Sequence, residues 1–150
     1  MHILFVEDDD DKAEKITNEI ARVRNSVTLI RAKSFGTALR QLVRNTPMVD
    51  GIMLDMSMPN YDNSIEPPEH FAGRDLLRQL KLRRISKPVF VVTMLDKFGS
   101  GSFQLSIDQL DVQLSKEFSP SYLGIIYYSS AQESWKLRLI DMLDRVEGLK

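Results

Sequence analysis

The sequence predicts an α/β fold in which helices cover both faces of a parallel β-sheet. Short apolar runs, several of them rich in β-branched residues, alternate along the chain with amphipathic segments of helical period. This alternation is typical of βα units that build a parallel sheet. The length of 150 residues suits one domain with its own core, so we expect a single domain over residues 1–150.

The first two βα units are predicted from the N-terminal third of the chain. Residues 3–6 form a continuous apolar run, which suits a strand covered on both faces. Apolar residues at helical spacing then predict a helix of about 14 residues: Ala13, Ile16, Ile20 and Val23. Residues 27–30 predict a second strand, and Ser34 is placed to cap a second helix.

A third strand and a long loop are predicted next. Residues 49–54 form the strand, which ends at Asp55. Pro59, Pro67 and Pro68 exclude a regular helix from the polar segment that follows. The connection between the third strand and the third helix is therefore unusually long.

The last elements are predicted from leucine spacing and from a second apolar run. Leu76, Leu77 and Leu80 place the third helix, and Pro88 precedes a strong fourth strand at residues 89–92. A short helix fits residues 103–110, and the alternation of residues 112–116 predicts a fifth strand at the edge of the sheet. Apolar residues at helical spacing mark a closing helix: Trp135, Leu139, Ile140, Leu143 and Val146.

Composition and charge exclude several classes of protein. Twenty basic and twenty-one acidic side chains give a net charge of -1, which provides no overall attraction to nucleic acid. The chain has no Cys, so disulfides, thiolate metal sites and Cys nucleophiles are excluded. The first ten residues pass from a short apolar run directly into acid, unlike a signal peptide or a membrane span. We expect a cytoplasmic protein with no nucleic-acid or membrane partner.

Complementary polar groups follow the predicted strands. In an open parallel sheet, ligands bind at the carboxyl ends of the strands. The residues at these ends are Glu7 and Asp8 after the first strand, Asp55 after the third, Thr93 after the fourth and Lys116 after the fifth. Carboxylates from neighbouring strands suit Mg²⁺, which offsets their repulsion and leaves one carboxylate free to attack phosphorus. Hydroxyl and ammonium groups can then donate to phosphoryl oxygens.

These motifs resemble the receiver domain family of response regulators over nearly the whole chain. The matching segments occur in the family's order: Val6-Glu7-Asp8 for the acidic pair, Leu54-Asp55 with Met58-Pro59 for the phosphorylation motif, Val92-Thr93 for the switch hydroxyl, and Lys116 for the lysine. The resemblance implies a three-layer, flavodoxin-like sandwich around a five-stranded parallel sheet of strand order 2-1-3-4-5.

The resemblance also implies a role for each site residue. Asp55 would be the phosphoacceptor and Asp8 a direct Mg²⁺ ligand, while Glu7 would act through water. The backbone carbonyl of Ser57 would complete the metal shell. Thr93 and Lys116 would bind the phosphoryl group and couple it to a change of surface.

The implied function is that of a stand-alone receiver in two-component signalling. It would take its phosphoryl group from a histidine kinase or a histidine phosphotransfer protein, with Mg²⁺ as cofactor. Its output would be contact with a downstream protein or passage of the phosphoryl group onward, and it would act as a monomer or weak homodimer. Such a domain is a signalling phosphoacceptor rather than an enzyme, although slow autodephosphorylation is expected.

Three departures from the family pattern keep alternatives open. Glu117 follows Lys116 where proline is common, Gln113 stands where many members have an aromatic residue, and Met94 stands where a small residue is frequent. The positions of Glu117 and Gln113 favour an alternative, a phosphorylation-independent (pseudo-receiver) interaction module, whereas the side chain of Met94 would shade the site and slow access by small phosphodonors or water. An Mg²⁺-dependent phosphohydrolase ranks last, because Ser57 stands where such enzymes have a second Asp.

Overall fold

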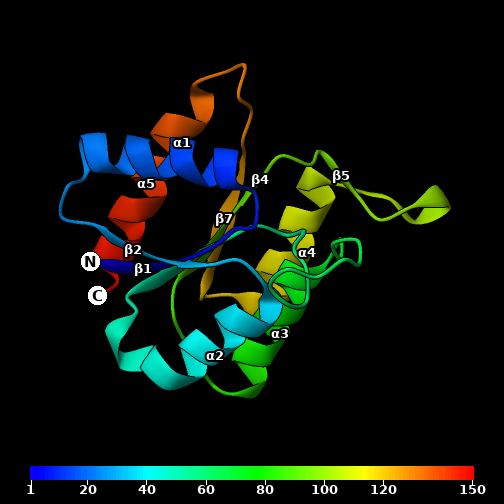
Figure 1. Cartoon of the computed structure of the whole chain (residues 1–150), viewed down its shortest axis with the longest axis horizontal. Coiled ribbons are helices and arrows are strands. Elements are labelled where there is room, and N and C mark those ends of the chain that lie inside the picture. The colour runs from blue at the N-terminus through cyan, green and yellow to red at the C-terminus, as the bar shows by residue number, and fades with distance from the viewer.

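A computed structural model describes residues 1–150 and contains one central sheet of five parallel strands (Figure 1). The strands are β1 (His2–Val6), β2 (Thr28–Ala32), β3 (Gly51–Leu54), β4 (Val89–Thr93) and β7 (Tyr122–Tyr127). Their order across the sheet is β2-β1-β3-β4-β7, and every neighbouring pair is parallel. The predicted fold class and strand order are confirmed, with β7 as the fifth strand.

Five helices cover the two faces of the sheet. They are α1 (Asp10–Val23), α2 (Phe35–Asn45), α3 (Ala72–Leu82), α4 (Ile107–Phe118) and α5 (Ser134–Gly148). Helices α1 and α5 pack on one face, and α2, α3 and α4 pack on the other (Figure 1). Two short 3-10 helices, Thr46–Met48 and Gly101–Phe103, follow α2 and β5 (Lys97–Phe98) in the chain.

The core consists of two apolar layers, one on each side of the sheet. Because side chains alternate along a strand, β1 supplies Leu4 and Val6 to the layer under α2, α3 and α4. It supplies Ile3 and Phe5 to the layer under α1 and α5. All four side chains are buried, as expected for a strand covered on both faces.

Local capping explains where several helices begin. The side chain of Asp9 accepts a hydrogen bond from Lys12 N at the start of α1, and that of Ser34 accepts from Thr37 N at the start of α2, as predicted. Ser106 and Gln109 form a reciprocal capping box at the start of α4.

The prediction of a fifth strand at residues 112–116 is wrong, because these residues lie in α4. Leu110, Leu114 and Phe118 are buried at a spacing of four residues, whereas Val112 is exposed, so the period is helical. The capping box at the start of α4 also favours a helix here. The true fifth strand, β7, begins only at Tyr122.

The predicted placement of Lys116 at a strand end is wrong for the same reason. Lys116 lies exposed in the last turn of α4. Since α4 leads into the start of β7, this turn is at the amino edge of the parallel sheet, opposite the carboxyl ends of the strands. Gln113 is likewise an exposed residue of α4. Its position therefore does not correspond to the aromatic residue that many receivers carry on the fifth strand.

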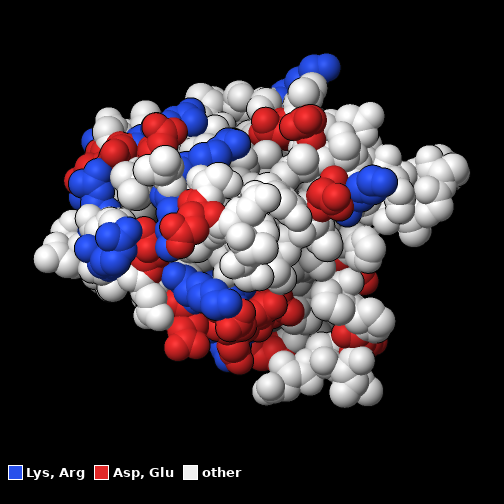
Figure 2. Space-filling model, turned by 90° about the horizontal axis from the view of Figure 1, so that it is seen from above, with Lys and Arg blue, Asp and Glu red and all other residues white.

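A two-stranded hairpin, not predicted from the sequence, connects β4 to α4. Its antiparallel strands are β5 (Lys97–Phe98) and β6 (Leu105–Ser106). It projects from the domain at the right of Figure 1. In Figure 2, seen from above, the tip of this projection carries no charged side chain, whereas Lys and Arg lie among Asp and Glu on the body of the domain.

Candidate functional site

The candidate site lies at the carboxyl ends of β1 and β3, where the strand order reverses. The chain passes from β1 outward to β2 and then returns to the other side of β1 to form β3. Backbone hydrogen bonds continue the sheet past both strand ends, from Glu7 N to Ala32 O and from Asp55 N to Val6 O. These bonds hold Glu7 and Asp55 beside one another at the position where open α/β sheets bind ligands.

Three predicted metal ligands converge at this point. Glu7, Asp8 and Asp55 each present a carboxylate oxygen, and these oxygens all lie within 4.8 Å of one another. Ser57, whose carbonyl was the fourth predicted ligand, is half-buried in the loop two residues after Asp55. A cluster of hard oxygen donors on two neighbouring strand ends has the donor chemistry that Mg²⁺ requires.

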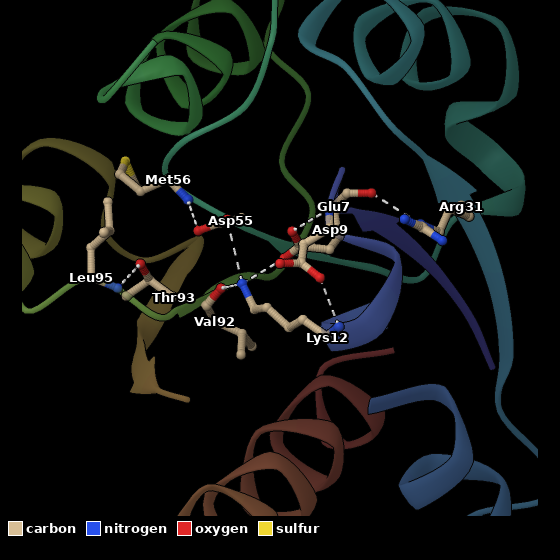
Figure 3. A network of polar contacts seen from close by, with 9 residues as sticks. All are labelled: Glu7, Asp9, Lys12, Arg31, Asp55, Met56, Val92, Thr93 and Leu95. Carbon is tan, nitrogen blue, oxygen red and sulfur yellow. Dashed lines mark hydrogen bonds and ion pairs between the residues drawn. The ribbon is translucent and has the colours of Figure 1, made fainter. Parts of the chain in front are cut away.

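A lysine that the sequence analysis did not select completes the cluster (Figure 3). Lys12 lies in the first turn of α1, and its side chain is only 1% exposed. Its Nζ is 2.5 Å from Glu7 Oε2 and 3.4 Å from Asp55 Oδ2. It also donates a hydrogen bond of 2.8 Å to the carbonyl of Val92. The site therefore contains three carboxylates and one buried ammonium.

The sequence did contain a signal for Lys12. It stands four residues before Ile16 and eight before Ile20, on the face of α1 that packs against the sheet. A charged residue on the buried face of a helix is rare unless it is paired. That position could have identified Lys12 as a site candidate.

Asp55 is held in an environment that disfavours its charged form. Its Oδ1 accepts a 2.7 Å hydrogen bond from Met56 N, and the residue is 8% exposed. Burial raises the pKa of the Asp55 carboxyl, while the charge of Lys12 and the Met56 hydrogen bond oppose the rise. An added positive charge would favour the ionised form that a nucleophile needs.

Thr93 is the last residue of β4, in agreement with its predicted place at a strand end, and it is fully buried. Its hydroxyl oxygen accepts a 3.1 Å hydrogen bond from Leu95 N, and its carbonyl accepts from Tyr128 N. The hydroxyl proton takes no part in these two bonds, so the hydroxyl can still donate one hydrogen bond.

The end of β7 carries no lysine. Tyr127 is its last residue, and Tyr128 and Ser129 follow. Tyr128 is buried, and its ring lies 4.9 Å from that of Trp135. The residues at the end of the fifth strand therefore offer packing and hydroxyl groups, and the ammonium comes from α1.

The ionisation of Glu7 predicts a dependence of stability on pH. Burial raises the pKa of Glu7 from its ordinary 4.5 to about 7, opposed by the charge of Lys12 and reinforced by that of Asp55. The folded state thus binds the proton of the Glu7 carboxyl more tightly than the unfolded state does. Protonation of Glu7 therefore stabilises the fold at low pH, and this stabilisation is lost as pH rises from about 4.5 to about 7.

The substitution Glu7→Gln removes that titration. In metal-free buffer, we expect the unfolding free energy of the wild type, relative to that of Glu7→Gln, to fall across this pH window. Urea titrations at several pH values measure the difference. A difference independent of pH would contradict the raised pKa.

Comparisons with known proteins support one family. The chain is 29% identical over 146 residues to the Detocs response regulatory protein DtcB of Enterobacter cloacae. The aligned segment covers 93% of this chain and 96% of that protein. No family model matches the chain.

Solved structures give the same fold. The receiver domain of the Francisella response regulator 1452 superposes with a TM-score of 0.67 and 21% sequence identity, covering 99% of this chain and 98% of that one. The non-phosphorylated HemR receiver domain from Leptospira biflexa has a TM-score of 0.62 and 19% identity, covering 97% and 92%. None of the helices is long and apolar enough to cross a membrane.

Proposed function

We propose that this chain, which has the fold of response-regulator receiver domains, is itself such a receiver and that Asp55 accepts a phosphoryl group from a phosphohistidine. The donor would be a sensor histidine kinase or a histidine phosphotransfer protein. The observation that carries the proposal is the position of Asp55, which directly follows β3 at the switch point of the sheet, within the cluster of Glu7, Asp8 and Lys12.

The proposed reaction is a phosphoryl transfer between two side chains. A lone pair of an Asp55 carboxylate oxygen attacks phosphorus, and an O–P bond forms. The P–N bond of the phosphohistidine breaks, its electron pair stays on the imidazole nitrogen, and that nitrogen takes a proton from solvent. Asp55 becomes an acyl phosphate, and no electron is transferred to or from any other group.

Mg²⁺ fits the donor set of this site, because three carboxylate oxygens lie within 4.8 Å of one another. We propose that Asp8 and Asp55 bind it directly, with Glu7 acting through water and the Ser57 carbonyl as a further ligand. When bound, Mg²⁺ neutralises negative charge on the phosphoryl oxygens. The protein's own part is to hold Asp55 in line, through the bond from Met56 N, and to exclude water around it.

The proposed output is a change of surface next to Thr93. Its hydroxyl would donate to a phosphoryl oxygen, which draws the end of β4 toward the site. The β5–β6 hairpin and α4 follow directly in the chain, so they would carry the change to a downstream protein. We propose a cytoplasmic signalling protein that acts through protein contacts as a monomer or weak homodimer.

The test of this function is the intact mass of the protein after incubation with Mg²⁺ and acetyl phosphate. We expect a phosphoryl adduct that disappears in Asp55→Asn and that EDTA prevents. Asn keeps the size of the side chain but has no anionic oxygen to attack phosphorus. A phosphorylated histidine phosphotransfer protein is the second donor. It is needed because Asp55 is buried, and a protein donor that docks on the domain can orient its phosphohistidine toward Asp55, whereas a small donor cannot.

A second candidate is a phosphorylation-independent interaction module. It is favoured by the ion pair of Lys12 with Glu7, which neutralises part of the acidic cluster without a metal. Isothermal titration calorimetry with Mg²⁺ distinguishes the two candidate functions. A receiver that works by phosphorylation should bind Mg²⁺ with loss of binding in Asp8→Asn, whereas absence of both Mg²⁺ binding and adducts would favour the module.

A further inference from the structure

We propose that Lys12 of α1 supplies the ammonium that binds the phosphoryl group on Asp55, in place of a lysine at the end of the fifth strand. This inference rests on the proposed function and assigns one residue of the same site. It concerns a group that binds the reacting phosphoryl oxygens, so Lys12 would be a catalytic residue.

The geometry already holds the ammonium against the reacting carboxylate. Lys12 Nζ lies 3.4 Å from Asp55 Oδ2, 2.5 Å from Glu7 Oε2 and 2.8 Å from Val92 O. Asp55 and Glu7 directly follow β3 and β1, and Val92 lies in β4, so the three partners come from three different strands. A lysine this completely buried is strongly destabilising unless it is paired, so its position depends on these acceptors.

The other cations near the cluster have different partners. Arg31 donates to the carbonyl of Glu7 and pairs with Asp10, on the outer side of the acidic segment. Lys15, one turn further along α1, is half-exposed and pairs with Asp11. Lys12 is therefore the cation that contacts Asp55, and β7 brings none to this edge of the sheet.

Phosphorylation of Asp55 would strengthen the interaction of this site with the Lys12 ammonium. It replaces the single charge of Asp55 with a group of nearly two negative charges and three acceptor oxygens. The ammonium has three donors on a flexible four-carbon stem. The bond to Val92 O can hold the stem while the donors now turned to Asp55 and Glu7 shift to phosphoryl oxygens.

The experiment compares Lys12→Gln with Lys15→Gln in the full chain. Beryllofluoride, which mimics a bound phosphoryl group, is titrated in the presence of Mg²⁺, and Mg²⁺ alone is titrated separately. We expect Lys12→Gln to weaken beryllofluoride binding about tenfold to a hundredfold, the size of a charge-assisted hydrogen bond. Mg²⁺ affinity should stay equal or rise, because a competing cation has left the cluster. Lys15→Gln should match the wild type in both titrations.

The absence of cysteine from the chain allows a rescue. The variant Lys12→Cys is alkylated with 2-bromoethylamine in denaturant and refolded, which restores an ammonium on a side chain of nearly the same length. Recovery of beryllofluoride binding and of the rate of adduct formation supports the proposal, and it also addresses a Lys12→Gln variant that fails to fold.

Two outcomes would overturn it in distinguishable ways. If the wild type forms adducts and Lys12→Gln binds beryllofluoride equally well, Lys12 only neutralises the cluster and the proposed function stands. If the wild type forms no adduct and binds no beryllofluoride with Mg²⁺ present, the proposed function is wrong and this inference is wrong with it.

Discussion

Replacing Gly73 with alanine is expected to lower the unfolding free energy by about 3 kcal/mol, the upper range for overpacking a core. An added Cβ would lie 2.5 Å from Leu54 Cδ1, 2.6 Å from Asp55 O and 2.9 Å from Met56 Cα. Two of these atoms belong to the backbone of Asp55 and Met56, so a side-chain rotation cannot remove the clash. Gly73 N also donates to Met56 O, which ties the start of α3 to this segment.

Gly148→Ala is the matched control for this change. It lies at the end of α5, and an added Cβ there has no neighbouring atom within 4 Å. Alanine favours a helix over glycine by up to about 1 kcal/mol, so this variant should be as stable as the wild type or slightly more stable. Urea unfolding followed by circular dichroism measures both. Wild-type stability of Gly73→Ala would mean that α3 does not approach the Asp55 segment this closely.

The substitution Gly73→Ala should impair phosphorylation as well as stability, because the added Cβ would displace Asp55 itself. In Gly73→Ala we expect slower adduct formation under conditions in which the protein is still folded. A displacement of even an ångström from the productive geometry is enough to slow a positioned reaction strongly. The Gly148→Ala protein should react at the wild-type rate.

Replacing Phe98 with alanine is expected to lower the unfolding free energy by about 3 kcal/mol or more, as for other fully buried phenylalanines. Phe98 is a residue of β5 that is 0% exposed, and its ring lies 6.4 Å from that of Phe71. It belongs to the apolar layer shared by α3 and α4. It thus anchors the β5–β6 hairpin to the domain, together with the partly buried Leu105 of β6.

Phe103→Ala makes the same chemical change near the tip of the same hairpin. Phe103 is 86% exposed, so its replacement should change stability by less than about 0.5 kcal/mol. Amide hydrogen exchange gives a second measurement. Phe98→Ala should increase exchange in the hairpin and the first turn of α4, and Phe103→Ala should not. Equal effects of the two substitutions would show that the hairpin is not anchored through Phe98.

Much of the architecture follows from local patterns in the chain. The continuous apolar run of β1 and the helical spacing of α1 are signals contained within a few residues, and both elements were predicted. The parallel order of the sheet follows from the alternation of strands and helices together with the family resemblance. Because the carboxyl ends of parallel strands meet at one edge of the sheet, the sequence is enough to predict that Glu7, Asp8 and Asp55 converge.

The region between β4 and β7 could not be predicted as well. Val112 and Leu114 alternate with polar residues over a short stretch, and so short a stretch fits a strand and a helix almost equally. The packing of Leu110, Leu114 and Phe118 in the layer beside α3 decides for the helix. The assignment of Lys116 to the site was wrong because it depended on the strand.

Lys12 shows what only the tertiary structure could decide. Its helical position could have suggested burial, but its partners are Glu7, Asp55 and Val92, up to 80 residues away along the chain. Whether a lysine is solvated or buried depends on acceptors that distant segments bring to it, since an unpaired ammonium would not stay in the core. Sequence patterns are local and locate the carboxylates at strand ends, whereas the source of the ammonium is decided by how α1 packs across three strands.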